Sequence, residues 1–293
     1  MAYVLEQIIN GFCQGSIFAL FAIGFALIAG VTGLATFTHG EVVMTGAFTV
    51  YYFSRYISSN LFLNIIIVFF ITGLLGIVIH KICYERFFNA PHYIPLVCTI
   101  AMSMILKNLV QIFLGSETKA MPQTGVPGFI SLGTIRINWI QITVICVVVF
   151  LCAALWFFLN KTTPGRILRA VSNDKTAAAL AGINVGRATL LGNVIGCGIG
   201  GMGGALYAFY YSTFSPVMGL SISMKAFSSA VLGGMTGIAS SAAGGVIIGI
   251  FENLGVMLFS SSLRDLVAFV FLIVVLLFMP EGLKLSRESK PGI

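Results

Sequence analysis

Long apolar runs separated by short polar segments dominate the chain. The runs cover residues 8–30, 42–53, 61–82, 93–114, 139–159, 188–211, 225–238, 242–259 and 266–279. A helix needs about 20 mostly apolar residues to cross a bilayer, and fewer where the segment is broken or re-entrant. We therefore predict an all-α polytopic membrane protein with eight or nine transmembrane segments and two broken or re-entrant segments.

The composition is that of one membrane domain spanning residues 1–293. Of these residues 58% are hydrophobic and only 9% are charged, whereas soluble domains carry about 25% charge. The net charge of +7 does not indicate nucleic-acid binding, because the basic residues gather in a few loops. The six cysteines lie in or beside apolar runs without a C-x-x-C pair, so we expect small buried side chains.

The basic residues indicate which loops face the cytoplasm. Lysine and arginine concentrate at 81–86, at 161–187 and in the tail after residue 283, and positively charged loops mark the cytoplasmic face. The polar loop 115–138, rich in Pro and Gly, is then external. Nine crossings place the N-terminus outside and the C-terminus inside, whereas eight crossings would reverse the N-terminus. The first residues lack the basic start of a cleavable signal, so we expect the first run to insert as a transmembrane segment.

Two polar interruptions share a sequence pattern. Residues 22–43 match residues 226–247 at an offset of 204, with the pattern A-x3-A-x3-G-x-T-G-[LI]-A-[ST]-x3-G-x-V-[VI]. Transporters are often built from two repeats whose interrupted helices line the pathway. We therefore predict an internal repeat, with breaks at 30–42 and 234–246.

The first break carries ionisable and hydroxyl groups at membrane depth. Thr38 and Glu41 have the T-x-x-E spacing of a capping box, which predicts that Glu41 caps a helix starting near Gly40. The alternative role is in the solute pathway, since ionisable groups inside a membrane are costly and usually functional. The two roles are compatible.

Other polar residues within the spans leave similar alternatives open. Glu252 has either a pathway role or a hydrogen bond within the bundle, and Lys107 either snorkels or pairs with a neighbouring helix. The candidate residues of the solute pathway are Thr32, Thr36, His39, Glu41, Thr236 and Glu252.

No catalytic or nucleotide-binding constellation is apparent. Gly196, Gly198 and Gly201 satisfy G-x-G-x-x-G, but they lie in an apolar span with no strand before them, and glycine at four-residue spacing indicates close helix packing instead. The phosphate-loop motif G-x-x-x-x-G-K-[ST] does not occur. The three histidines are far apart. We expect no metal site, no cofactor bound by this chain and no enzymatic activity of its own.

The basic loop 161–187 contains a short helix with its own start and stop signals. Asn173 is a favourable N-cap residue, Asp174 follows where the helix dipole favours an anion, and Gly182 stands where a left-handed residue would end the helix. Because the chain has no phosphate loop, energy for transport would arrive through a cytoplasmic contact. We predict that this helix docks an energy-supplying partner.

Four blocks of sequence together resemble a known family. They are GVTGLATFTHGEVVMTGAF at 30–48, TPGRILRAVSNDKTAAALAGIN at 163–184, KAFSSAVLGGMTGIASSAAGGVIIGIFENL at 225–254 and LLFMPEGL at 276–283. The chain resembles, over nearly its whole length, the shorter of the two homologous permeases of branched-chain amino acid ABC importers.

This resemblance implies a multi-pass subunit in the cell (inner) membrane. It implies a second homologous permease, two cytoplasmic ATP-binding subunits that use ATP, and an extracytoplasmic solute-binding protein, for which the loop 115–138 is a candidate dock. It identifies 163–184 as the ATPase-contacting loop. The predicted coupling residues are Gly165, Arg166, Arg169, Ala170, Asn173, Asp174, Ala177, Ala178 and Gly182. Lys107 departs from the family, in which we expect an uncharged polar residue.

Branched-chain amino acids are the expected solutes. Close relatives of the family import urea or short amides and more distant ones import sugars, so these solutes stay open. A stand-alone secondary transporter or channel is the alternative of a different class. It would need a paired, ion-carrying acid network, and Glu41 and Glu252 are the only acids plainly within the spans.

Overall fold

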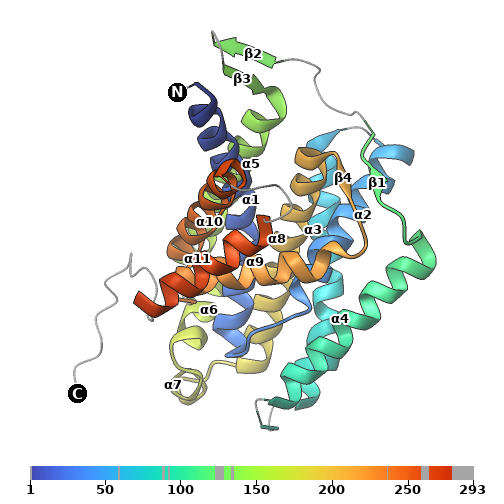
Figure 1. Cartoon of the computed structure of the whole chain (residues 1–293). Coiled ribbons are helices and arrows are strands. Elements are labelled where there is room, and N and C mark those ends of the chain that lie inside the picture. Colours follow the sequence, from blue (N-terminus) through green and yellow to red (C-terminus); the bar gives the residue numbers. More distant parts are fainter. Residues whose placement is uncertain are drawn as a thin grey trace.

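The chain folds into a bundle of long helices that run between two ends of the molecule (Figure 1). The computed structural model describes residues 2–58, 60–87, 90–91, 93–122, 129–132, 135–235, 237–258 and 264–278. The long helices are α1 (Ala2–Thr32), α2 (His39–Tyr56), α3 (Leu61–Ile79), α4 (Tyr93–Leu114), α5 (Trp139–Lys161), α8 (Val185–Tyr211), α9 (Met218–Leu232), α10 (Ile238–Leu258) and α11 (Arg264–Phe278). Two shorter helices between α5 and α8 are α6 (Thr163–Asn173) and α7 (Lys175–Leu180). A π-helical turn (His80–Tyr84) and a 3-10 turn (Glu85–Phe87) extend α3.

Six helices in the described part of the chain are long and apolar enough to cross a membrane. They are Glu6–Thr32, Leu61–Phe87, Tyr93–Leu114, Trp139–Lys161, Val185–Tyr211 and Ile238–Met257. The predicted class, an all-α polytopic membrane protein, is confirmed. The apolar run predicted at 225–238 is shifted, because α9 ends at Leu232 and two glycines follow it.

The loops that carry the basic clusters share one end of the molecule. In Figure 1, α6, α7 and the start of α4, which follows the basic turn 81–86, lie at the lower end. The N-terminus and the strands lie at the upper end. There β1 (Lys119–Ala120) pairs with β4 (Thr213–Phe214), and β2 (Phe129–Leu132) pairs with β3 (Ile135–Asn138), both antiparallel. The loops 161–187 and 115–138 are therefore at opposite ends, as the charge pattern requires. The basic tail lies outside the described residues.

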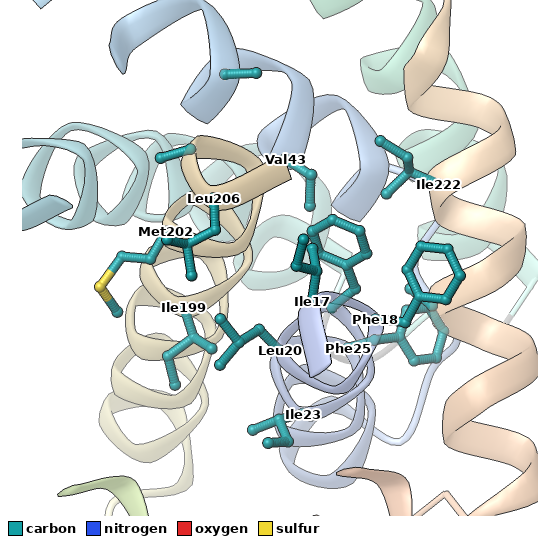
Figure 2. Packing of buried hydrophobic residues seen from close by; sticks show 14 of the residues in the cluster. Ile17, Phe18, Leu20, Ile23, Phe25, Val43, Ile199, Met202, Leu206 and Ile222 are labelled. Atoms are coloured by element: carbon teal, nitrogen blue, oxygen red, sulfur yellow. The ribbon is translucent and has the colours of Figure 1, made fainter. Parts of the chain in front are cut away.

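Helix α1 forms the centre of the bundle. It packs along α8 and α10 and also contacts α9. Its side chains Ile17, Phe18 and Phe25 are at most 2% exposed, and Figure 2 shows Leu20 facing Ile199 of α8. Burial on every side explains why this run is apolar without an amphipathic stripe.

Glycines allow α8 to approach α1 and α2 closely. A Cβ added at Gly196 would meet Gly24 O and Ile28 of α1, and one at Gly204 would meet the backbone of Val43 in α2. Small residues at such contacts bring helix backbones together within a membrane. The predicted packing role of these glycines is confirmed.

Both predicted interruptions break a helix. After α1 ends at Thr32, Gly33 takes a left-handed φ of +72° and the chain runs non-helically to α2. After α9 ends at Leu232, Gly234 takes a φ of +83° and α10 follows. The two helix ends are 200 residues apart rather than 204, so the structural correspondence is shifted from the sequence match. Common descent of the two halves stays a prediction.

Helix α2 begins deep in the bundle rather than at its end. The His39 Nε2 atom lies 3.1 Å from Phe21 O, in the middle of α1. Ser223 of α9 binds both the first turn of α2 and the non-helical backbone before it: Gly40 N–H donates to Ser223 Oγ (2.8 Å), and Ser223 Oγ donates to Phe37 O (3.0 Å). Non-helical backbone at membrane depth is stable only where protein or water satisfies it.

Candidate coupling loop and solute pathway

Helix α6 is fixed to the bundle by one face. Thr162 caps it by accepting a hydrogen bond from Gly165 N–H (3.2 Å). A Cβ at Gly165 would collide with the backbone at the end of α5, which explains why glycine occupies this position. Leu168 is buried, while Arg166 and Arg169 are exposed. The loop therefore presents a basic face to solvent.

Asp174, not Asn173, caps α7. The Asp174 carboxylate accepts hydrogen bonds from the N–H groups of Thr176 (2.8 Å) and Ala177 (3.0 Å), and its backbone is extended (φ −154°, ψ 110°). Asn173 is still helical, as the last residue of α6. The predicted cap is wrong by one residue, because the loop contains two helices and the turn between them falls on Asp174.

Helix α7 ends in an exposed apolar tip. Ala178 is 5% exposed and faces the bundle, whereas Leu180, which the sequence analysis did not single out, is 86% exposed. Ile183 N–H donates to Ala178 O (3.0 Å), and Gly182 has a φ of +82°. The predicted left-handed end at Gly182 is confirmed. Of the other predicted coupling residues, Ala170 is half-buried and Ala177 is exposed.

Lys175 joins this loop to the first break. Its Nζ donates a hydrogen bond to Thr32 O, the last carbonyl of α1. The last carbonyls of a helix have no intrahelical partner and attract a cation. Burial lowers the pKa of the Lys175 ammonium. A residue that the sequence analysis did not select thus connects α7 to the chain that leads into α2.

Four predicted pathway residues lie at the first break and are buried. Thr32, Thr36, His39 and Glu41 are at most 7% exposed. Thr32 Oγ1 donates to Ile28 O (2.7 Å), so this hydroxyl is occupied within α1. A fifth candidate, Thr236, lies outside the described residues.

His39 fills the gap between α1 and α8. Its ring meets Phe25 edge-on, with centroids 6.0 Å apart, and a Cβ at Gly200 would collide with it. Its Nδ1 has no hydrogen-bond partner among the described residues. The ring therefore serves packing, and one of its nitrogens stays unused.

The predicted capping box does not form. Thr38 is itself helical (φ −71°, ψ −19°) and makes no side-chain cap. Its Oγ1 donates instead to Thr99 O on α4 (2.9 Å). The Glu41 side chain does not turn back to the backbone but faces α4, where Ser103 Oγ donates to its Oε1 at 3.4 Å. Within the part of the chain that the structure describes, Glu41 Oε2 has no hydrogen-bond partner.

Glu252 belongs to a separate charged cluster. Its Oε1 accepts hydrogen bonds from Gln14 Nε2 (2.8 Å) and Lys225 Nζ (3.1 Å), and it lies 3.5 Å from Arg264 Nε. Lys225 Nζ also pairs with Asp265 Oδ1 at 2.8 Å. The cluster joins α1, α9, α10 and α11. Of the two roles left open for Glu252, a hydrogen bond within the bundle is observed.

Other members of the charged cluster around Glu252 were missed because they are distant from it in sequence. Lys225 stands where a predicted run begins and Asp265 just before another, so both looked like flanking charges. The only feature of the sequence that indicated these residues was a charged residue at the edge of an apolar run.

Comparison with known proteins shows similarity over nearly the whole chain. The chain is 32% identical to the high-affinity branched-chain amino acid transport system permease protein BraD of Pseudomonas aeruginosa, over 96% of this chain and 95% of that protein. It is 34% identical to LivH of Escherichia coli, a protein of the same description, over the same shares. It is 25% identical to the ribose import permease protein RbsC of Haemophilus influenzae, over 93% and 84%. No solved structure matches the chain.

The sequence model of one family matches residues 7–276. This match covers the central helices, the loop with α6 and α7, and both breaks. With the membrane-length helices, it makes the chain a multi-pass protein of the cell (inner) membrane. The chain belongs to the family described as the permease component of the branched-chain amino acid transport system.

Proposed function

We propose that the chain is the membrane-spanning permease subunit of an ATP-binding-cassette importer that carries leucine, isoleucine and valine into the cell. The observation that carries this proposal is the exposed tip of α7, tied through Lys175 to the end of α1 where the first break begins. The similarity to BraD and LivH supports the solute class.

Separate cytoplasmic ATPases drive transport in this proposal. The α7 tip offers an apolar side chain, Leu180, and the neighbouring face of α6 offers Arg166 and Arg169. A complementary partner would present an apolar hollow with acidic residues near it. A push on α7 would reach Thr32 through Lys175 and would move the non-helical segment 33–38, which positions the start of α2.

Two further partners complete the importer. A solute-binding protein would dock at the end of the molecule that carries the paired strands. A second homologous permease would cover part of the outward apolar surface, and lipid would cover the rest. Several large side chains of α4 are exposed, among them Met104, Ile112 and Phe113.

Two alternatives remain distinguishable from this proposal. The same class of importer could carry urea or short amides. A stand-alone secondary transporter needs coupled acids, but Glu252 is engaged with two cations and Gln14, so Glu41 is left without an acidic partner in the described bundle. This arrangement favours an external energy source.

Reconstitution tests the proposal. The chain is assembled in liposomes with its ATP-binding subunits, partner permease and binding protein, and uptake of leucine, urea and acetamide is measured with and without ATP. We expect uptake of leucine that needs both ATP and the binding protein, and exceeds urea uptake at least tenfold. Uptake of urea but not leucine would establish the other solute class. Leucine uptake by this chain alone would overturn the importer proposal.

A further inference from the structure

A cavity of about 670 Å³ lies between α7 and the π-helical turn His80–Tyr84. Its lining includes Lys175, Thr176 and Ala179 of α7 and both ends of that turn. Helix α7 is at the end of the molecule that carries the basic loops (Figure 1), which is the predicted cytoplasmic side. A cavity of this size is typical of small-molecule sites. A ligand bound here would touch the loop 161–187 from the cytoplasm.

Lys175 brings a cation without an acidic partner into the lining. An ammonium donates up to three hydrogen bonds, and one of those from Lys175 goes to Thr32 O. Among the described residues Lys175 forms no ion pair, because the adjacent Asp174 carboxylate accepts from the N–H groups of Thr176 and Ala177 instead. Burial lowers the pKa of the Lys175 ammonium, and an anion beside it would favour the charged form. Lys175 therefore has donors left for an anionic group of a ligand.

His80 adds an unused acceptor to the same lining. The ring is buried, at 4% exposure, and its Nε2 lies 3.1 Å from Thr189 Oγ1. Thr189 Oγ1 donates its own hydrogen to Gly186 O (3.0 Å), so it accepts from His80 and Nε2 carries the ring proton. Nδ1 is then an acceptor, and it has no donor among the described residues. Polar groups of both kinds thus line the cavity without a complete set of partners, and π-helical turns are frequent at functional sites.

The rest of the lining suits a short aliphatic group. Leu34, Pro95 and Ile183 contribute to it, and each of them is buried or half-buried. Removing a branched hydrocarbon chain from water against these side chains would add to affinity. The cavity therefore combines a cation with an apolar surface.

We propose that this cavity binds a small carboxylate with a branched apolar chain from the cytoplasm, and that binding weakens the link between α7 and α1. The carboxylate accepts hydrogen bonds from Lys175 Nζ, and the apolar chain packs against Leu34 and Ile183. A carboxylate is a stronger acceptor for an ammonium than a neutral carbonyl, so it draws Lys175 away from Thr32 O. Transport then slows relative to ATP hydrolysis.

Two cytoplasmic compounds share this ligand chemistry. One is the imported amino acid itself, and the other is the 2-oxo acid that remains when its amino group is removed. In either case the product of import would restrain further import. The identity of the ligand rests on the proposed function, whereas the site rests on the cavity and Lys175.

Ligand protection of a thiol introduced by Val185→Cys tests binding without transport. Val185 lines the cavity at the start of α8, and Ala181→Cys provides an exposed control thiol in the same loop but outside the lining. The assembled importer is labelled with a maleimide in the absence of ATP and binding protein, and labelling is followed on the peptide that contains the new thiol. Leucine and 4-methyl-2-oxopentanoate are compared with leucinamide, which lacks the carboxylate. We expect at least one of the two carboxylates, at millimolar concentration, to slow labelling at least threefold at position 185 but not at 181, and leucinamide to have little effect; the stronger carboxylate identifies the source.

Charge variants identify the contact. Protection should be lost with Lys175→Met, and retained with Lys175→Arg and with the matched control Lys161→Met. Equal protection by leucinamide, protection that survives Lys175→Met, or no protection by either carboxylate would overturn the site.

Vesicles loaded with ATP then test the effect on coupling. The protective carboxylate, enclosed on the cytoplasmic side, should lower leucine uptake per ATP hydrolysed at least twofold, and enclosed leucinamide should not. An unchanged ratio would overturn the proposed weakening of the link. ATP-dependent leucine uptake without any enclosed compound, measured in parallel, separates failure of this inference from failure of the importer function.

Discussion

Gly182 is the residue at which the coupling loop is most sensitive to a single methyl group. Its φ of +82° is strained for any residue with a Cβ, although no atom of the described residues would touch that Cβ. A β-branched residue suffers most in this region. In Gly182→Val the left-handed backbone should cost about 1–2 kcal/mol. This cost should displace the α7 tip and reduce solute-stimulated ATPase activity several-fold.

The neighbouring Ala181 provides the matched control for that prediction. It is also exposed, but its backbone is unstrained at φ −76°. Ala181→Val adds the same side chain to the same surface. If both variants lower ATPase activity equally, the effect comes from the docking surface and not from the left-handed turn.

Lys175 carries the prediction that links the loop to the pathway. Lys175→Met keeps the length of the side chain but removes the hydrogen bond and charge at Thr32 O. We expect nucleotide hydrolysis to continue while leucine uptake per ATP falls severalfold, because the ATPases would still dock on α7. Lys161→Met, which removes an exposed lysine from the same loop, should leave the ratio unchanged. An unchanged ratio in Lys175→Met would contradict the link.

For single residues, the sequence predicted local backbone conformation better than it predicted tertiary contacts. Gly182 was predicted correctly because a left-handed residue after helix formers is a local property. The predictions of an N-cap at Asn173 and of a capping box at Thr38 and Glu41 were wrong, because each depended on where a helix begins. Tertiary contacts decided that: Thr38 bonds to α4, and Asp174 lies at a turn between two helices.

At the scale of elements, the charged cluster fastens α9 to α10 and α11. Lys225 is 8% exposed and contacts both Glu252 and Asp265. Removing one partner of a buried ion pair leaves an uncompensated charge and typically costs about 3–5 kcal/mol. Lys225→Met should lower the thermal midpoint of the detergent-purified protein by several degrees.

Two further variants determine whether that loss comes from the ion pair. Lys81→Met, at an exposed position, should leave the thermal midpoint unchanged. The double variant Lys225→Met with Glu252→Gln should recover part of the loss, since it no longer strands a carboxylate. No recovery would mean that lost packing against Phe18, whose ring lies 5.3 Å from Lys225 Nζ, dominates instead.

Helix positions were predictable because burial in a membrane demands length and apolarity together. Tyr93–Leu114 was predicted to the residue. The start of α9 was not predicted, because glycine and serines interrupt the apolar sequence VMGLSISM before Lys225. These small residues are nevertheless compatible with a helix that packs on α2. The two breaks were recognised from their glycine and threonine residues. The residues at which the helices end could be determined only from the folded chain.

For the whole molecule, the arrangement makes a strong prediction about sidedness. The loop 161–187 and the turn 81–86 lie at one end and the strands at the other (Figure 1). Since lysine and arginine favour the cytoplasmic side, single thiols introduced by Arg187→Cys and Lys119→Cys in a cysteine-free background should lie on opposite faces of the membrane. In intact cells an impermeant maleimide should label the second variant and not the first, while inverted vesicles should give the reverse.

The same experiment constrains the number of crossings. Labelling of both variants from outside would contradict the bundle as described. A third thiol, introduced by Val4→Cys near the N-terminus, should be labelled from outside, because α1 begins at the end that carries the strands and runs unbroken to Thr32 at the opposite end. An external N-terminus together with a cytoplasmic 161–187 loop requires an odd number of crossings before that loop. Four membrane-length helices precede the loop in the described part of the chain, so the segment that contains α2 must supply a fifth crossing. The contact between His39 and the middle of α1 places the start of α2 at membrane depth, as such a crossing requires.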